Sequence, residues 1–319
     1  MIVLDRLTKN FGALTAVDGI TLAVEKGEVL GFLGPNGAGK TTTMRMIAGY
    51  LEPSDGTARV CEFDLARHPI EAKRRIGYVP EGAPLYGDMT CRGFLAFVAD
   101  VRGFDPAERR RRIDRVVEMV ELGEVLDRPI ETLSKGFKRR VGLGQALIHD
   151  PPVLILDEPT DGLDPNQKHH VRALIRGMAK DKAIIVSTHI LEEVEAACTR
   201  AVIIADGRVV ADGTAEDLLA RLPEHNSVVA TVPTVEAAAA RTALRDLALS
   251  NAVGLSEAQT DGLVTFRLAT RDGLPAPLAD VAHRLKGAGI TVEALRVERG
   301  RLDDVFRVLT TRTETDHAA

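Results

Sequence analysis

The sequence predicts an α/β fold in which a parallel core sheet presents polar residues at its strand ends. A glycine-rich stretch, residues 34–42, separates an apolar run from a segment whose apolar residues recur at helical spacing. A second apolar run ends in Asp157 and Glu158, and a third leads into Thr188 and His189. Ligands of such folds bind at the carboxyl ends of parallel strands. We therefore expect these polar residues on the ligand edge of one sheet.

Length and composition limit the classes of protein to consider. With 319 residues, of which 45% are apolar, the chain can form two domains with proper cores. The formal net charge of −5 gives no general attraction to nucleic acid or anionic lipid. No apolar run is long enough to span a bilayer, and the first residues lack a signal-peptide layout. We therefore expect a cytoplasmic protein that reaches a membrane only through a protein partner.

The three cysteines form no Cys-x-x-Cys pair, which is typical of reduced thiols.

Short apolar segments at 2–7, 16–17 and 20–24 predict a small antiparallel sheet beside the core. Phe11 is expected on a loop of this sheet, ahead of Gly12. An exposed aromatic ring at such a place can stack on an adenine. The alternative is that the ring packs against its own sheet.

The glycine-rich stretch predicts a phosphate site. Glycines allow successive backbone N–H groups to point at one anion, and the positive end of the following helix adds to their effect. Lys40 would reach the outer phosphates of a nucleotide, and the Thr41 hydroxyl would bind Mg²⁺. The alternative, a plain turn between strand and helix, is disfavoured by the full spacing and flanks. The expected binding residues are Gly34, Pro35, Asn36, Gly37, Ala38, Gly39, Lys40, Thr41 and Thr42.

The middle of the chain adds a strand and several helices. The strand 76–79 is stopped by a proline, and Glu81 follows it, where its carboxylate can face a metal or simply the solvent. Thr90 and Asp105 are expected to cap two helices. Four consecutive arginines at 109–112 share their segment with acidic residues at 108, 114, 118 and 121, which favours a solvated face over a nucleic-acid site.

Several polar residues after residue 130 predict an anion-binding helix start, a metal ligand and a general base. Ser134 caps a helix whose first turn, with Gly136, exposes N–H groups to an anion, although a simple cap is the alternative. Successive strand residues point to opposite sides, so Asp157 and Glu158 should have different tasks. Asp157 is expected to bind Mg²⁺, and Glu158 to act as general base, an effect of about 10²–10⁴ in rate. The alternative is a pair of ordinary strand-end caps. His189 is expected to donate to a terminal phosphate.

In this order the motifs resemble the nucleotide-binding subunits of ATP-binding cassette (ABC) transporters, over residues 1 to about 222. The resemblance implies a P-loop NTPase cassette: a parallel core sheet, an antiparallel β subdomain and a helical signature subdomain at about 85–150. It implies that residues 34–41 are the Walker A motif, 133–137 the signature and 154–158 Walker B. It also assigns Glu81 to the Q-loop, Asp164 to the D-loop at the ATP site, His189 to the switch histidine and Phe11 to adenine stacking.

Two motifs differ from the usual ABC pattern, and both differences point to one branch of the family. The signature reads Leu-Ser-Lys-Gly-Phe instead of Leu-Ser-Gly-Gly-Gln, and Glu81 replaces a glutamine. Both look like the multidrug, sodium and gliding-motility exporter branch, as do residues 162–167 and 302–306. Because Ser134 and the Gly136 N–H remain, the anion-binding part of the signature should still work.

Residues 223–310 follow the cassette. Their expected order, βαββαβ with a final helix, predicts a small α+β ferredoxin-like domain. Its role in regulation, dimer contact or partner contact stays open. Residues 311–319 are expected to be a disordered tail.

The function that follows is ATP hydrolysis coupled to transport. The resemblance implies a head-to-tail dimer, either a homodimer or one with a paired homologue. Lys40, Thr41, Asp157, Glu158 and His189 of one subunit would face Ser134 and Gly136 of the other across ATP and Mg²⁺. A separate transmembrane permease, contacted near residues 86–89, would hold the subunit on the inner face of the cell membrane. The alternative for residues 86–89 is a plain surface turn. The alternative is a soluble ABC ATPase acting on nucleic acid or ribosomes, but such proteins usually carry tandem cassettes or a long coiled coil. A binding module without turnover would lack Glu158.

Overall fold

The computed structural model describes residues 1–319 except 83–84, 223–224, 271–276 and 317–319. The chain forms two compact units. Unit 1 is Met1–Thr214 together with the end of the last helix, and unit 2 is Ala215–Arg312. The sequence interpretation placed this boundary slightly later, after residue 222. Among the described residues, none of the helices combines the length and the apolar character that a membrane span requires.

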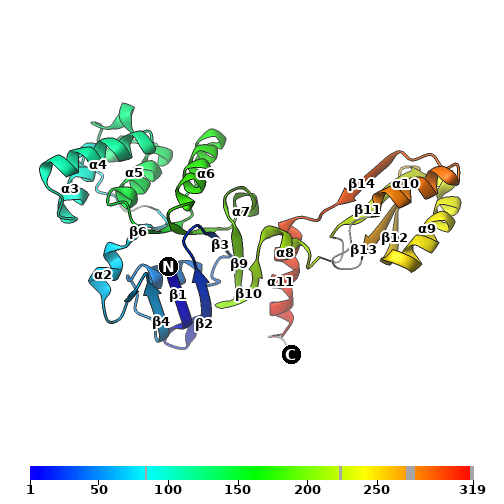
Figure 1. Ribbon diagram of the computed structural model, residues 1–319, viewed down its shortest axis with the longest axis horizontal. Coiled ribbons are helices and arrows are strands. Elements are labelled where there is room, and N and C mark those ends of the chain that lie inside the picture. The colour runs from blue at the N-terminus through cyan, green and yellow to red at the C-terminus, as the bar shows by residue number, and fades with distance from the viewer. Residues whose placement is uncertain (83–84, 223–224, 271–276, 317–319) are drawn as a thin grey trace. The chain divides into compact units, whose positions relative to one another are not determined.

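The centre of unit 1 is a six-stranded sheet in the order β10-β9-β3-β8-β7-β6. Figure 1 labels its strands β3, β6, β9 and β10. Its first five strands in chain order run parallel, and β10 returns antiparallel beside β9 as the second strand of a hairpin. Residues of β3, β7 and β8 are buried throughout, as strands covered on both faces must be. The parallel core sheet is therefore confirmed. The strands are β3 (Val29–Leu33), β6 (Ile76–Val79), β7 (Val153–Asp157), β8 (Ala183–Thr188), β9 (Arg200–Ala205) and β10 (Arg208–Gly213).

A second, antiparallel sheet of unit 1 has the order β2-β1-β4-β5. It consists of β1 (Ile2–Phe11), β2 (Leu14–Val24), β4 (Asp55–Val60) and β5 (Phe63–Asp64). The expected small sheet is present, but two details differ. The segments predicted at 16–17 and 20–24 form one long strand, and Phe11 ends β1 where a loop was expected, because the hairpin pairs it with Leu14. Helix α2 (Pro69–Arg74) follows this sheet.

Two helices of unit 1 begin at the side-chain caps that the sequence predicts. Thr90 accepts a hydrogen bond from the Gly93 N–H at the start of α3, and Asp105 accepts two at the start of α4, as expected from their cap positions. On α4, Arg109 pairs with Asp100 at 2.7 Å and Arg112 with Glu108 at 2.6 Å, so this run of arginines has acidic partners within the protein. Besides α2, the helices of unit 1 are α1 (Lys40–Ile47), α3 (Cys91–Val101), α4 (Pro106–Met119), α5 (Lys135–Leu147), α6 (Pro165–Ala179) and α7 (Leu191–Ala197), with short 3₁₀ turns at Gly123–Val125 and Ile130–Thr132.

Unit 2 contains the predicted βαββαβ order. Its antiparallel sheet has the strand order β12-β13-β11-β14, the arrangement of a ferredoxin-like fold, and Phe266 is fully buried in its core. Helix α11 continues to Asp316, through positions where a disordered tail was expected, and residues 317–319 lie outside the described part. The elements are α8 (Ala215–Leu219), β11 (Ser227–Pro233), a 3₁₀ turn (Thr234–Glu236), α9 (Ala237–Asn251), β12 (Ala252–Thr260), β13 (Leu263–Thr270), α10 (Leu278–Gly287), β14 (Ala294–Glu298) and α11 (Leu302–Asp316).

Candidate functional site

The glycine-rich stretch forms a tight loop between β3 and α1, in the context that a phosphate loop needs. Gly37 and Gly39 have φ of 85° and 99°, a region that side chains rarely adopt. A Cβ on Gly39 would also lie 2.4 Å from the Ala16 carbonyl oxygen of β2. Only glycine fits there, and the first-turn N–H groups of α1 have no partner within the helix. The loop therefore offers backbone donors to an anion.

Lys40 begins α1 and is 7% exposed. Its Nζ donates hydrogen bonds to the carbonyl oxygens of Gly34 at 2.7 Å and Pro35 at 3.0 Å. Burial lowers the pKa of Lys40, and the charges of Glu158, Asp157 and Glu81 oppose that effect. These three carboxylates therefore act electrostatically on the same ammonium group. Thr41 and Thr42, next in the helix, are half-buried.

Asp157, the last residue of β7, is fully buried and pairs in register with Ser187 of β8. Neither of its carboxylate oxygens has a hydrogen-bond partner among the described residues. A buried carboxylate without donors is costly unless a cation compensates it. The donor set here, a carboxylate near the helix that carries the Thr41 hydroxyl, is of the hard-oxygen type that Mg²⁺ prefers. These residues therefore fit a magnesium ion.

Glu158 and His189 form the polar centre of the site. Glu158 Oε1 lies 3.0 Å from His189 Nδ1, and the Glu158 N–H donates to the Ser187 carbonyl oxygen at 3.0 Å. Burial raises the pKa of Glu158, while the hydrogen bond from His189 and the charge of Lys40 act in the opposite direction. The expected alternation of Asp157 and Glu158 along a strand does not apply, because β7 ends at Asp157 and Glu158 has a left-handed φ of 49°. This turn in the backbone separates the two carboxylates.

The signature segment lies at the start of α5, where Ser134 Oγ accepts from the Phe137 N–H at 3.4 Å. Lys135, the residue that departs from the family pattern, pairs with Asp161 at 2.7 Å. A Cβ on Gly136 would meet Gln167 Oε1 at 2.5 Å. Among the described residues, no hydrogen bond or ion pair joins Ser134 or Gly136 to residues 34–42 of the same chain. The structure therefore brings the signature to the 161–167 segment and not to the phosphate loop.

The remaining predicted residues lie around this centre. Asp164 caps α6 by accepting from the Gln167 N–H at 2.9 Å. Phe11 is 48% exposed, and the Lys9 ammonium lies 5.4 Å from the centre of its ring. Glu81 lies in an exposed turn just after β6. These positions leave the Phe11 ring and the Glu81 carboxylate accessible to a ligand.

Comparisons with known proteins identify the family. A family model described as ABC transporter matches residues 17–161. The linearmycin resistance ATP-binding protein LnrL of Bacillus subtilis (strain 168) is 35% identical over 326 residues, covering 99% of this chain and 100% of that protein. This chain belongs to the ABC transporter family of ATP-binding subunits. The Nod factor export ATP-binding protein I of Paraburkholderia xenovorans (strain LB400) is 41% identical over 217 residues, 68% of this chain and 71% of that protein. A solved ATP-binding subunit of an ABC transporter matches with a TM-score of 0.64 at 34% identity, over 68% of this chain and 91% of the other.

Membership of the ABC family confirms the predicted cassette fold and the prediction of an ATPase. Sequence reasoning nevertheless missed one residue of this cassette. Glu193 on α7 is 3% exposed and accepts hydrogen bonds from the hydroxyls of Thr160 and Thr188, which adjoin the Glu158 and His189 segments. A signal existed: Glu193 lies four residues before buried Ala197, on the inward face of an amphipathic helix.

Proposed function

We propose that this chain is the ATP-hydrolysing subunit of an ABC exporter, with Glu158 as general base and His189 as its partner. The observation that carries the proposal is the hydrogen bond between Glu158 Oε1 and His189 Nδ1, 3.0 Å long, beside the buried Lys40. A carboxylate whose pKa is raised by burial is a better proton acceptor than one in water. The export assignment rests on relatives named for Nod factor export and linearmycin resistance. The alternative of a nucleic-acid or ribosome ATPase has no such support.

In the proposed mechanism, the backbone of residues 34–42 and the Lys40 ammonium bind the outer phosphates of ATP. Glu158 accepts the proton of the attacking water, and the exposed His189 ring is free to contact the terminal phosphate. Thr41, Asp157 and Glu81 would hold Mg²⁺, which neutralises charge on the phosphate oxygens when it is bound. The Phe11 ring would stack on the adenine. Catalysis then depends on placing charges and the water, as in phosphoryl transfer generally.

The second wall of the ATP site is proposed to come from another subunit. Ser134 is exposed at the first turn of α5, where N–H groups can bind an anion. Since neither it nor Gly136 bonds to the phosphate loop of its own chain, we place them across ATP from a partner cassette. The partner is either a second copy or a paired homologue, with Asp164 of each chain near the interface.

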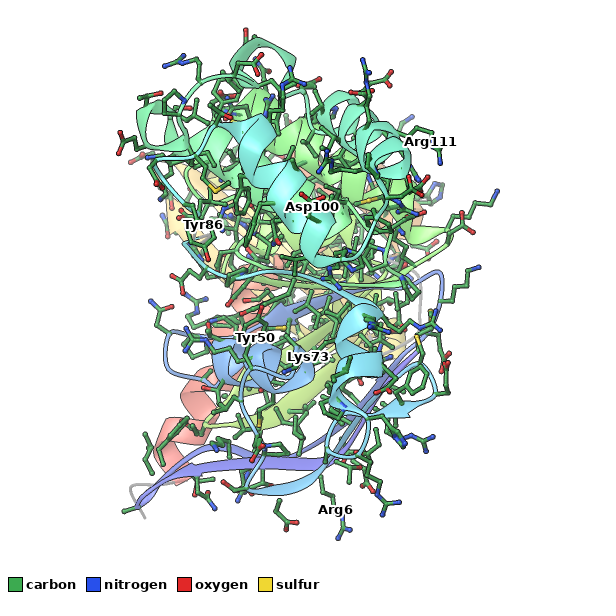
Figure 2. All side chains as sticks on the ribbon, turned by 90° about the vertical axis from the view of Figure 1, so that its left-hand side faces the viewer. Arg6, Tyr50, Lys73, Tyr86, Asp100 and Arg111 are labelled. Carbon is green, nitrogen blue, oxygen red and sulfur yellow. The ribbon has the colours of Figure 1, made fainter. Side chains whose placement is uncertain are left out.

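A groove on unit 1 is proposed to receive the permease. Its volume is about 700 Å³, and its lining combines exposed apolar side chains with the cations Lys73, Arg74 and Arg102. Exposed apolar side chains mark interaction sites when they gather in one patch. Tyr86 packs edge-on against Phe97 of this groove, with ring centres 5.8 Å apart. Figure 2 shows Tyr86, Tyr50 and Lys73 on the same side of unit 1. Binding there would hold the subunit at the cytoplasmic face of a membrane. The exposed apolar residues of the groove are Tyr50, Ile70, Phe97 and Val101.

The central experiment is phosphate release by the purified full chain with Mg-ATP. We expect Glu158→Gln to abolish turnover, to keep ATP affinity and to elute as a dimer with Mg-ATP in gel filtration. Glu192→Gln, which changes an exposed glutamate of α7, is the control and should behave as wild type. Full turnover by the Glu158 variant would rule out this residue as the base, and a monomer at saturating Mg-ATP would contradict the dimer.

The permease contact needs its own test. The full chain is used to capture partners from detergent-solubilised membranes, and the captured membrane protein is identified. Tyr86→Ala should reduce capture at least about tenfold, since exposed aromatic anchors dominate such interfaces. Leu14→Ala, which changes an exposed apolar residue on the antiparallel sheet, should not. Equal capture by both variants would exclude Tyr86 from the contact.

A further inference from the structure

Glu193 is a buried carboxylate that the proposed mechanism does not use. It lies on α7, directly after the switch histidine segment, and is 3% exposed, whereas Glu192 and Glu195 on the same helix are exposed. Glutamates are almost never fully buried unless they are paired. A glutamate as buried as Glu193 must therefore have hydrogen-bond or ionic partners inside the protein.

Two threonine hydroxyls donate to the carboxylate of Glu193. Thr188 Oγ1 donates to Oε2 at 2.9 Å, and Thr160 Oγ1 donates to Oε1. The Thr188 oxygen in turn accepts from the Ile190 N–H at 3.1 Å, so its own proton is directed to Glu193. All three side chains, those of Glu193, Thr160 and Thr188, are buried. Each oxygen of the carboxylate thus holds one hydroxyl in a fixed direction.

The two threonines belong to the segments that carry the reacting groups. Thr160 follows Glu158 by two residues, after a proline, and Thr188 immediately precedes His189. The Glu193 carboxylate therefore joins the segment that follows β7 to the last residue of β8. Glu158 and His189, which lie on these two joined segments, form the 3.0 Å contact of the site.

Two cations of α6 meet the same carboxylate. Lys168 Nζ and Arg172 Nη2 each lie 3.6 Å from Glu193 Oε1. They compensate the buried negative charge, which would otherwise be costly. Asp164, proposed to face the partner subunit, caps α6, so the helix that follows it also contacts Glu193. Three segments of the ATP site therefore converge on one side chain.

We propose that Glu193 is a positioning residue that holds Glu158 and His189 in the geometry for ATP hydrolysis, acting through the hydroxyls of Thr160 and Thr188. The inference rests on the proposed function, because it assigns Glu193 to the hydrolytic step of that site. Glu193 touches neither the phosphate loop nor Lys40 in the described contacts, so it governs turnover and not nucleotide binding.

The test compares Glu193→Gln with Glu192→Gln in the full chain. Glutamine keeps the shape but loses the charge and one acceptor. We expect kcat for ATP hydrolysis to fall about 10–100-fold, since misplacing a catalytic group by about 1 Å can cost 10²-fold. KM and the Kd of a fluorescent ATP analogue should change less than about twofold, and Glu192→Gln should match wild type on all measures.

Threonine variants separate positioning from a merely structural role. Thr160→Val and Thr188→Val remove only the hydroxyls and should each lower kcat at constant nucleotide affinity. The double variant Thr160→Val, Thr188→Val lacks both hydroxyls through which Glu193 is proposed to act. Adding Glu193→Gln to this double variant should therefore lower kcat by less than a further factor of about three. Equal losses in both backgrounds would overturn the proposal.

Each remaining outcome also decides the question. Wild-type kcat in folded Glu193→Gln overturns the inference and leaves the proposed function intact. If Glu193→Gln does not fold, as judged by circular dichroism and the fraction of chains that bind nucleotide, the threonine variants decide alone, and unchanged kcat in both overturns it. Absence of turnover in the wild-type chain with Mg-ATP would instead overturn the proposed function, and the inference with it.

Discussion

His149 should make unit 1 lose stability as the pH falls below about 6.5. It lies two residues after the end of α5, and its Nε2 lies 3.0 Å from the Ile76 carbonyl oxygen, to which a neutral ring donates. Nδ1 is buried without a partner among the described residues. Burial, followed by the charge of Arg102, lowers the pKa of His149 from 6.5 to about 4. Between these two pKa values, His149 is therefore neutral in the folded chain and protonated in the unfolded chain.

The sign and the size follow from that difference. The folded pKa lies below the unfolded value, so the stabilisation is fully present above pH 6.5 and is lost as the pH falls towards 4. Since a difference of one in pKa corresponds to about 1.36 kcal/mol, the full effect is about 3 kcal/mol. Between pH 7 and pH 5 the same relation gives a loss of about 2 kcal/mol.

The assay is urea unfolding of wild type and His149→Gln at pH 7, 6 and 5, followed by far-ultraviolet circular dichroism. Glutamine can still donate to the Ile76 carbonyl, and every other titrating group is shared, so the difference between the two proteins isolates His149. Wild type should lose about 2 kcal/mol more than the variant between pH 7 and pH 5. His169→Gln, at an exposed position of α6, is the control and should follow wild type. Parallel curves for wild type and His149→Gln would refute the reasoning.

Three further outcomes are expected. Thr90→Ala removes the oxygen that accepts from the Gly93 N–H and should lower the free energy of unfolding by about 1 kcal/mol in urea unfolding; Thr90→Ser should restore it. Gly39→Ala forces a Cβ against the Ala16 carbonyl at a φ of 99° and should weaken ATP binding at least about tenfold in a nucleotide titration, whereas unaltered affinity would contradict the predicted loop strain. Glu81→Gln keeps an oxygen ligand and should keep ATPase activity within about threefold in phosphate-release assays, and a collapse with nucleotide binding intact would show that the carboxylate itself is required.

Much of the fold followed from local patterns. The fully buried strands β3, β7 and β8 read as continuous apolar runs, and the caps Thr90, Asp105 and Ser134 begin helices where expected. The second unit followed from the order of its elements. These features depend on residues close together in the sequence, where periodicity and capping determine the local structure.

The parts that were missed depend on contacts between distant residues. The left-handed φ of Glu158 is held by the end of β8, where its N–H bonds to Ser187, 29 positions along the chain. The importance of Glu193 depends on Thr160 and Lys168, which only the packed fold brings to it. Phe11 was expected on a loop because the pairing of β1 with β2 leaves no local mark at the strand end. Periodicity cannot report such interactions.

The position of β3 in the central sheet has a consequence for synthesis of the chain. Its two neighbours, β8 and β9, begin at Ala183 and Arg200. The strand that leads into the phosphate loop therefore cannot form its hydrogen bonds until these later residues have been synthesised. Even the Ala38 carbonyl of the loop is held by the N–H of Gly207. At about 5–20 residues per second, a ribosome takes roughly 10–30 s to pass from the loop to β9. A nascent chain thus acquires nucleotide binding as one of the last events in the folding of unit 1, and chains truncated before Arg200 should emerge without it.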